Sequence, residues 1–270
     1  GGLAMEVGSR TYHTAIIARS LGIPCVVGVR GLMNRVDHGA PIVLDGSNGV
    51  VVVNPNREML REYRARIRKE KTFGEKLSYL RDLPAVTKDG YSVVLQANIE
   101  YPEECVSALE NGTQGIGLFR SEWFLTRGRG LFPSEEEQYI VYRQMAEQMK
   151  PWPVVVRAFD LSPSQLRMDS RSSESNPALG LRGIRLLLKN RGLFKDQVRA
   201  LLRARRHGNI KAMVPMISGV GELRQALETV EEAKLELRRD GLDFGEDLPF
   251  GVTLELPSAT AIADLLAEEA

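Results

Sequence analysis

The pattern of apolar and polar positions divides the chain into three regions. Residues 1–54 contain short apolar stretches separated by glycine-containing turns, which is typical of strands. Residues 55–88 are crowded with Arg, Lys and Glu and carry only a narrow apolar stripe, which predicts a helical linker between domains. Residues 89–270 alternate near-continuous apolar runs with helical patterns, which is typical of buried parallel strands joined by helices.

The first region is predicted to hold one helix among its strands. The apolar runs at residues 25–29, 41–44 and 50–53 indicate the strands. A helical pattern covers residues 14–21, and Gly22 stands where glycine commonly ends a helix. We interpret residues 1–54 as part of a larger domain, because the chain begins at a glycine and closes inside a helical pattern, as if truncated at both ends.

The third region predicts a series of β/α units. Its expected strands are residues 92–97, 115–119, 154–158, 211–216 and 251–256. Its expected helices are residues 102–112, 134–149, 181–189, 193–206, 221–239 and 258–269. Ser134 and the three glutamates after it form a capping box, which supports the second helix. The α/β pattern predicts the first five units of a (β/α)8 TIM-type barrel, with an open doubly wound sheet as the main alternative.

Charge and cysteine content narrow the function. Thirty-six basic and 35 acidic side chains nearly cancel, so the chain lacks the broad basic field of a nucleic-acid binder. No apolar run reaches the eighteen or so residues that span a bilayer, and no signal peptide opens the chain. Cys25 and Cys105 have no metal-ligand spacing, which favours a reduced, cytoplasmic compartment. We therefore expect neither nucleic acid nor membrane as a partner.

His13 is the first candidate for chemistry. It precedes the apolar helix of residues 14–21, and a helix N-terminus offers unpaired N–H groups and partial positive charge that suit a phosphate. A neutral imidazole in this position can attack a phosphoryl group. The alternative is that His13 only caps the helix or packs against it. His38 and His207 lack such a context.

Polar side chains also close the predicted strands of the barrel region. In a parallel barrel the chemistry gathers at the carboxyl ends of the strands. The polar residues at these ends are Asn98, Arg120, Glu122, Arg157, Asp160 and Glu255. Guanidinium groups bind phosphate oxygens in pairs, and a carboxylate can hold Mg²⁺, so this set suits a phosphate-bearing anion with a divalent cation. Each of these residues taken singly is equally compatible with a structural salt bridge.

Several of these segments resemble one family along nearly the whole chain. Residues 8–19, Gly-Ser-Arg-Thr-Tyr-His-Thr-Ala-Ile-Ile-Ala-Arg, resemble its phosphohistidine segment, and Gly-Ile-Gly-Leu-Phe-Arg-Ser-Glu at 115–122 resembles its second-strand signature. Leu-Glu-Leu-Pro at 254–257 is similar to its metal-ligand segment. The family is enzyme I of the phosphoenolpyruvate-dependent sugar phosphotransferase system, phosphoenolpyruvate-protein phosphotransferase, within the PEP-utilising enzymes. Pyruvate phosphate dikinase and phosphoenolpyruvate synthase are relatives whose barrel signatures are less similar.

The resemblance implies a role for each candidate residue. His13, on a swivelling domain at residues 1–54, would take the phosphoryl group from phosphoenolpyruvate and pass it to a histidine phosphocarrier protein. Arg120 and Arg157 would clamp that group, Arg182 would assist, and Glu255 would be one ligand of Mg²⁺. The barrel at residues 89–270 would release pyruvate, and the full-length protein would be a homodimer. Both sugar uptake and nitrogen-linked regulation remain open as the pathway.

The chain also departs from the family pattern. The family usually has glycine at position 9 and Ser or Cys at position 12, where this chain has Ser9 and Tyr12. Its Gly-Gly-Asp-Lys loop is replaced by Ser-Pro-Ser-Gln at residues 162–165, which predicts a stiffer loop without the cation. The second metal ligand and the catalytic cysteine are absent. We therefore expect the isolated chain to be inactive with phosphoenolpyruvate, and a catalytically impaired regulatory paralogue is the second interpretation.

Overall fold

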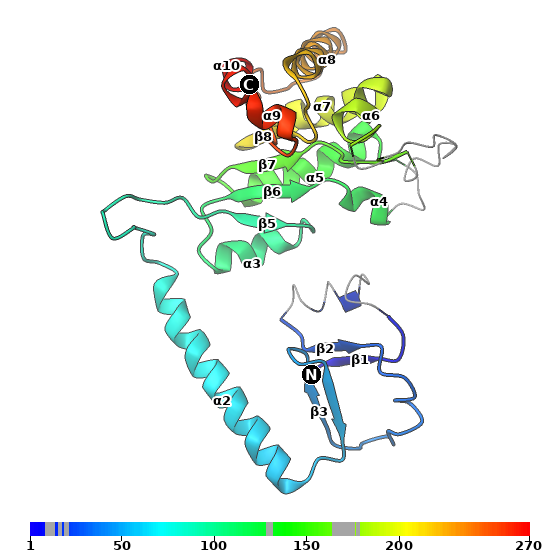
Figure 1. The fold of residues 1–270 in the computed structure, drawn as a ribbon, viewed down its shortest axis with the longest axis vertical. Coiled ribbons are helices and arrows are strands. Elements are labelled where there is room, and N and C mark those ends of the chain that lie inside the picture. The colour runs from blue at the N-terminus through cyan, green and yellow to red at the C-terminus, as the bar shows by residue number, and fades with distance from the viewer. Residues whose placement is uncertain (9–13, 16–17, 19–21, 128–131, 164–175, 177–178) are drawn as a thin grey trace. The chain divides into compact units, whose positions relative to one another are not determined.

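Two units make up the fold of the computed structural model, Gly1–Leu83 and Pro84–Ala270 (Figure 1). The second unit contains most of the large side chains that are fully buried, such as Phe119, Tyr142 and Phe159. The hydrophobic core therefore lies in the region that the sequence predicts to be a barrel. The residues that the structure describes are 1–8, 14–15, 18, 22–127, 132–163, 176 and 179–270.

Two small sheets form the first unit. Strand β1 (Leu3–Met5) pairs in parallel with β2 (Cys25–Val27), and β3 (Ile42–Asp45) pairs antiparallel with β4 (Val50–Val53). The strands predicted at residues 25–29, 41–44 and 50–53 are thus found, whereas β1 is too short to give a pattern. Of the predicted helix, Thr14, Ala15 and Ala18 are helical, and the rest of residues 14–21 lies outside the described residues.

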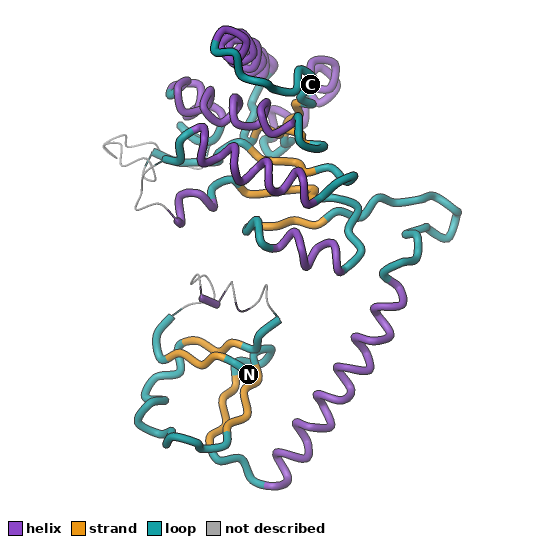
Figure 2. Tube along the Cα trace, turned by 180° about the vertical axis from the view of Figure 1, so that it is seen from behind, coloured by secondary structure: helices purple, strands orange, loops and turns teal. Residues whose placement is uncertain are grey.

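Helix α2 (Arg57–Leu80) follows the second sheet as one long helix (Figure 2). It contains no buried residue, as its polar pattern predicts. Its first turn is capped by Asn56, whose side-chain oxygen accepts a hydrogen bond of 2.8 Å from the Met59 N–H. Arg66 forms an ion pair of 2.9 Å with Asp45 at the end of β3. Across the part of the chain that the structure describes, α2 included, every helix lacks the length or the apolar content for crossing a membrane.

Five parallel strands form one sheet in the second unit. They are β5 (Ala97–Ile99), β6 (Ile116–Arg120), β7 (Val154–Arg157), β8 (Ile210–Val214) and β9 (Phe250–Val252), and they pair in chain order. The first strand begins later than its apolar run predicts, because the Val93 N–H bonds to the Ala85 carbonyl and the Leu95 N–H to the Gln114 side chain. The last strand ends at Val252, and residues 253–256 leave the ladder.

Helices connect these strands. They are α3 (Glu104–Glu110), α4 (Trp123–Arg127), α5 (Glu135–Gln148), α6 (Ile184–Lys189), α7 (Arg191–Arg205), α8 (Val220–Arg239), α9 (Pro257–Ala261) and α10 (Ala263–Glu269). The predicted capping box at Ser134 is present. Helix α3 packs against α5, α5 against α7, α7 against α8, and α8 against α10. Strands and helices that follow one another in the same order form consecutive β/α units of a TIM-type barrel, whereas a doubly wound sheet would change direction at a switch point.

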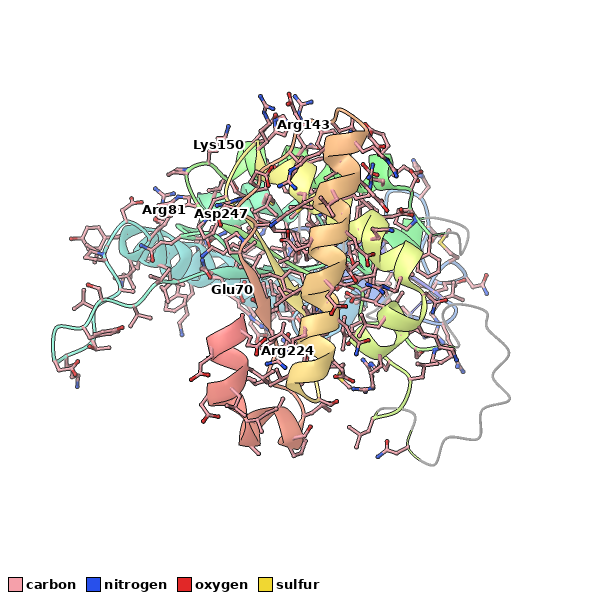
Figure 3. All side chains as sticks on the ribbon, turned by 90° about the horizontal axis from the view of Figure 1, so that it is seen from above. Glu70, Arg81, Arg143, Lys150, Arg224 and Asp247 are labelled. Carbon is pink, nitrogen blue, oxygen red and sulfur yellow. The ribbon has the colours of Figure 1, made fainter. Side chains whose placement is uncertain are left out.

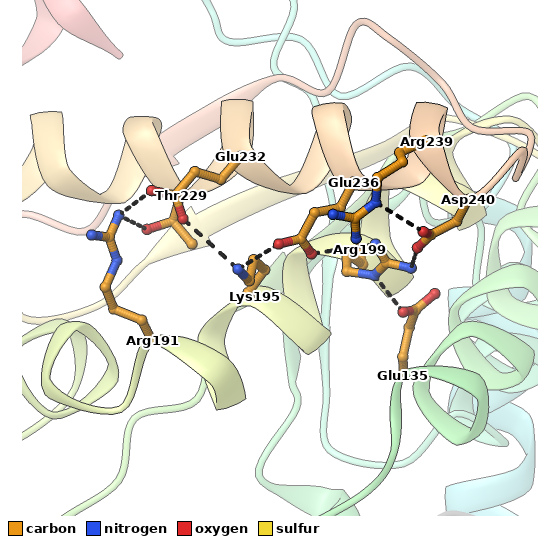
Figure 4. A network of polar contacts seen from close by, with 9 residues as sticks. All are labelled: Glu135, Arg191, Lys195, Arg199, Thr229, Glu232, Glu236, Arg239 and Asp240. Carbon is orange, nitrogen blue, oxygen red and sulfur yellow. Dashed lines mark hydrogen bonds and ion pairs between the residues drawn. The ribbon is translucent and has the colours of Figure 1, made fainter.

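Charged side chains join the outer helices. Arg199 on α7 is buried and bonds to Glu135 at 2.5 Å and to Asp240 at 3.0 Å, which links α5, α7 and α8 (Figure 4). Arg224 on α8, which is labelled in Figure 3, pairs with Glu269 on α10. Because Arg199 contacts more than one carboxylate, its charge stays compensated inside the helix layer.

Candidate functional site

The candidate site lies at the carboxyl ends of the strands of the second unit. Arg120 ends β6 and Arg157 ends β7, and the two residues are direct partners in the parallel register. Their side chains therefore leave the same edge of the sheet at neighbouring positions. Asn98 lies in β5, and Glu255 follows β9 by three residues, so the predicted strand-end residues come from four of the five strands.

Arg157 lies between two carboxylates. Its Nη2 atom is 3.2 Å from Glu122 Oε2, and its Nη1 atom is 3.7 Å from Asp160 Oδ2. The first contact is an ion pair without hydrogen-bond geometry. Glu122 Oε2 and Arg157 Nε are both buried, and neither atom has a hydrogen-bond partner within the described residues. Buried polar atoms are usually satisfied, so these two atoms have unused capacity to bind a ligand or water.

Asp160 contacts Glu122 and Arg182 in addition to Arg157. Its backbone N–H donates to Glu122 Oε1 at 2.5 Å, while its carboxylate accepts from Arg182 Nε at 2.8 Å and from Arg182 Nη2 at 2.9 Å. The hydrogen bonds that Arg182 donates to Asp160 raise the pKa of the Arg182 guanidinium, and Glu255 and Glu122 add to this effect. Arg182, predicted to assist at the phosphate, is therefore held in place by a fork-shaped pair.

Arg120 differs from the other two arginines. Its side chain is exposed, and within the described residues it has no ion-pair partner. An exposed guanidinium beside a compensated cluster keeps its donors for an external anion. Among the residues that the structure describes, Arg120 is thus the register partner of Arg157, and Asp160 connects Arg157 to Arg182.

Glu255 is hydrogen-bonded to a residue that follows the neighbouring strand, β8. Its Oε2 atom accepts a hydrogen bond of 3.0 Å from the backbone N–H of Met216, and the residue is otherwise exposed. Met216 has a φ of 63°, an uncommon conformation for a residue with a side chain. Arg185 on α6 donates to the Met216 carbonyl at 2.8 Å and to the Gly180 carbonyl at 2.7 Å. A strained residue held on both sides is typical of a functional site.

Glu255 by itself is compatible with a magnesium site completed by a substrate. Mg²⁺ is commonly bound by one or two carboxylates together with substrate phosphates and water. The described part of the chain holds no group of three or more His, Cys, Asp or Glu side chains placed to bind a metal. The exposed carboxylate therefore fits one ligand position, and the remaining ligands have to come from elsewhere.

Sequence reasoning did not find Arg185 and Gln197, two residues that support this edge. Arg185 stands three positions after Arg182, which is a same-face spacing on a helix and was a usable signal. Gln197 interrupts an apolar helical pattern at a position that faces the core. His13 and residues 164–175, which include Gln165, lie outside the described residues.

A separate hollow lies at the amino ends of the strands. It has a volume of about 640 Å³ and is lined by residues that include Lys150, Arg205, Arg206 and Asn209. Arg205 donates to Asn209 at 2.7 Å, and Arg206 forms an ion pair of 2.6 Å with Asp243. Because these cations are engaged and lie at the stabilising end of the barrel units, the hollow is not our candidate site.

Comparison with known proteins decides the family. The sequence profile described as the PEP-binding domain of PEP-utilising enzymes matches residues 74–270, and the profile of their mobile domain matches residues 1–49. The chain belongs to the PEP-utilising enzyme family. His13 lies in the segment that matches the mobile domain. Arg120, Arg157, Arg182 and Glu255 lie in the segment that matches the PEP-binding domain.

Curated relatives agree with this assignment. A phosphoenolpyruvate-protein phosphotransferase of Staphylococcus carnosus (strain TM300) is 41% identical over 271 residues, which is 99% of this chain and 47% of the relative. Proteins of the same name from Priestia megaterium and Geobacillus stearothermophilus are 40% and 42% identical, over 99% of this chain and 47% and 46% of the relatives. The chain thus spans about half the length of the curated relatives that it matches.

Proposed function

We propose that this chain is part of a phosphoenolpyruvate-protein phosphotransferase. The observation that carries the proposal is the register pair Arg120–Arg157, which brings two guanidinium groups to one edge of a family PEP-binding domain. Guanidinium groups bind phosphate oxygens in pairs. In barrel enzymes the substrate binds at the carboxyl ends of the strands. The matching names of the curated relatives support the same activity.

The reaction joins the two family segments of the chain. A nitrogen of the neutral His13 imidazole attacks the phosphorus of phosphoenolpyruvate, the bond from phosphorus to the enol oxygen breaks, and the enolate gains a proton to leave as pyruvate. Arg120 and Arg157 hold the phosphoryl oxygens and spread their charge, so positioning and electrostatics supply most of the rate. The phosphoryl group then passes from His13 to a histidine phosphocarrier protein.

The remaining parts of the proposal follow from the same family. Mg²⁺, with Glu255 as one ligand, neutralises charge on the phosphoryl oxygens when it is bound. Residues 1–54 form the phosphohistidine domain, residues 55–88 the linker and residues 89–270 the barrel portion. The polar helix α2 suits a linker because none of its residues needs to be buried. The complete protein acts in the cytoplasm as a homodimer.

The experiment is a phosphate map of the complete protein that contains this chain. After incubation with phosphoenolpyruvate and Mg²⁺, mass spectrometry that preserves phosphohistidine should find phosphate on His13, and His13→Ala should abolish it. Arg120→Ala should lower the labelling rate strongly, by about a hundredfold or more. Arg224→Ala, which changes an exposed arginine on α8, should leave it unchanged. Labelling that persists in His13→Ala, or none at all, contradicts the proposal.

A second candidate is a regulatory paralogue that binds phosphoenolpyruvate without transferring the group. The observation that favours it is Ser-Pro-Ser-Gln at residues 162–165, which replaces a flexible and cationic loop. Binding without phosphorylation of His13 in the complete protein would select this candidate. For the 270-residue chain alone we expect no turnover, because β5 and β9 are unpaired edges of the described sheet.

A further inference from the structure

Gln197 is a polar residue inside the core of the second unit. It lies on α7 with no exposed surface, and its helix neighbours Phe194, Val198 and Leu201 are buried to the same degree. An amide group in such a position costs stability unless its donors and its acceptor are all used. The contacts of this side chain therefore indicate what it does.

The amide of Gln197 makes three hydrogen bonds. Its Nε2 group donates to Ser121 Oγ at 3.0 Å and to the Tyr142 hydroxyl at 3.1 Å. Its Oε1 atom accepts from the backbone N–H of Phe159 at 3.1 Å. Because the Phe159 N–H can only donate, this contact fixes which side of the amide is the oxygen.

These partners stand next to the phosphate-binding arginines. Ser121 directly follows Arg120, and its hydroxyl donates to the Arg157 carbonyl at 2.7 Å. Phe159 directly precedes Asp160, which holds Arg182. A single buried amide thus connects the end of β6 to the end of β7, beyond the last ladder pair of the two strands.

We propose that Gln197 is a positioning residue that sets the separation of Arg120 and Arg157. The inference rests on the proposed function, because it concerns the geometry of the phosphate clamp. Without the amide, the Phe159 N–H and the Ser121 hydroxyl lose their shared partner, and the two strand ends are held less tightly, by the ladder and the bond from Ser121 to the Arg157 carbonyl. A displacement of the phosphate-binding groups by about 1 Å, even when a substitution elsewhere causes it, is enough to lower activity about a hundredfold.

The variants test the amide without opening a cavity. Gln197→Met keeps the length of the side chain and removes the hydrogen bonds, and Ser121→Ala removes only the bridging hydroxyl. Thr229→Val is the matched control, because Thr229 is also fully buried and polar, but its hydroxyl donates to the Gln225 carbonyl at 3.0 Å within α8 and accepts from Arg191 on α7 at 3.4 Å. All three are made in the complete protein carrying His13→Ala, so that binding is not followed by transfer.

Calorimetric titration with phosphoenolpyruvate and Mg²⁺, together with thermal unfolding, gives the outcome. We expect about tenfold or weaker affinity in Gln197→Met and in Ser121→Ala, with a double variant no weaker than the worse single one. Thr229→Val should keep full affinity, although its loss of thermal stability should be similar to that of the other two variants. Full affinity in both Ser121→Ala and Gln197→Met overturns this inference alone. Absence of binding by the His13→Ala parent overturns the proposed function and the inference with it.

Discussion

The Asp160 carboxylate accepts two hydrogen bonds from Arg182, at 2.8 and 2.9 Å, although the two residues are 22 positions apart in the sequence. The Asp160 side chain is 6% exposed and that of Arg182 is 37% exposed. The pair therefore has one buried and one hydrated member. The pair stabilises the fold mainly because Arg182 compensates the buried charge of Asp160, and less through the attraction between the two charges.

Asp160→Asn should lower the free energy of unfolding by about 1–2 kcal/mol, because the amide presents a donor where Arg182 also donates. The exposed guanidinium is screened by water, which keeps the loss below that of a fully buried pair. The midpoint of urea denaturation measures the change. Asp82→Asn is the control, since Asp82 pairs with Arg81 on the surface and should show no measurable effect. Equal midpoints for Asp160→Asn and the wild type would contradict the prediction.

Arg185→Lys should weaken metal binding in the complete protein. The Arg185 side chain is 20% exposed and donates to three carbonyls, one of which belongs to Met216. A lysine cannot reproduce this fork, so Met216 should lose the conformation that places its N–H on Glu255. We expect about tenfold weaker binding of Mn²⁺, a spectroscopic substitute for Mg²⁺, measured by the electron paramagnetic resonance of the free ion. Arg191→Lys, which changes a surface pair with Glu232, should bind the ion normally.

Gly183→Ala should be one of the most destabilising small substitutions in the second unit. Gly183 has a φ of 54°, and an added Cβ would lie 2.9 Å from the Met216 side chain. Strain and the displaced methionine together should cost about 2–4 kcal/mol. Gly74→Ala is the opposite case, because Gly74 lies inside α2 with open space around it, and the change should stabilise by about 0.5–1 kcal/mol. Thermal unfolding of both variants should shift in opposite directions, and a shared direction would refute the argument.

The sequence predicts the order of the second unit because burial on both faces leaves a continuous apolar run for each strand. The same signal misplaces the first strand, since Val93 and Val94 are apolar but exposed, and the ladder begins only at Ala97. Strand ends depend on hydrogen bonds to distant groups, such as the Leu95 N–H with the Gln114 side chain. Such contacts leave no trace in a local pattern.

The candidate site divides along the same line. Arg120, Arg157 and Glu255 could be named from the sequence because each closes an apolar run, and the parallel register pairs Arg120 with Arg157. The pairing of Asp160 with Arg182 was not predictable, because the two residues are 22 positions apart in the sequence and either carboxylate near Arg157 was an equal partner by charge. The packed structure decides which carboxylate pairs with which arginine, and the spacing of these residues in the sequence does not.

Stability should fall on acidification in a way that depends on His207. Its Nε2 atom is 3.0 Å from the Tyr139 hydroxyl, and its Nδ1 atom is 3.3 Å from Glu147. Burial lowers the pKa of His207, and the nearby Arg143 lowers it further, which outweighs the opposite effect of Glu147. The folded state therefore binds fewer protons than the unfolded state, in which histidine titrates near pH 6.5.

The sign of the effect follows directly. The contribution of a neutral His207 is complete above the pKa of the unfolded state and is lost as the pH falls through the lower pKa of the folded state. His207→Gln keeps a group that can bond to Tyr139 and cannot be charged. Urea midpoints at about pH 7.5 and pH 5.5 should differ less in this variant than in the wild type. A pH dependence that is unchanged by the substitution would exclude His207 as its source.

The two thiols should react at very different rates. Cys105 is fully buried, and burial raises its pKa to about 12, with Glu104 and Glu103 adding to the shift. The thiolate is the reactive form, and at pH 8 it makes up about one part in ten thousand of such a thiol. Cys25 is partly exposed, so iodoacetamide should label Cys25 in the folded chain and leave Cys105 unmodified. Unfolding in urea should expose both, and Cys25→Ser should remove the native labelling. Rapid native labelling of Cys105 would show that α3 opens far more readily than its buried packing implies.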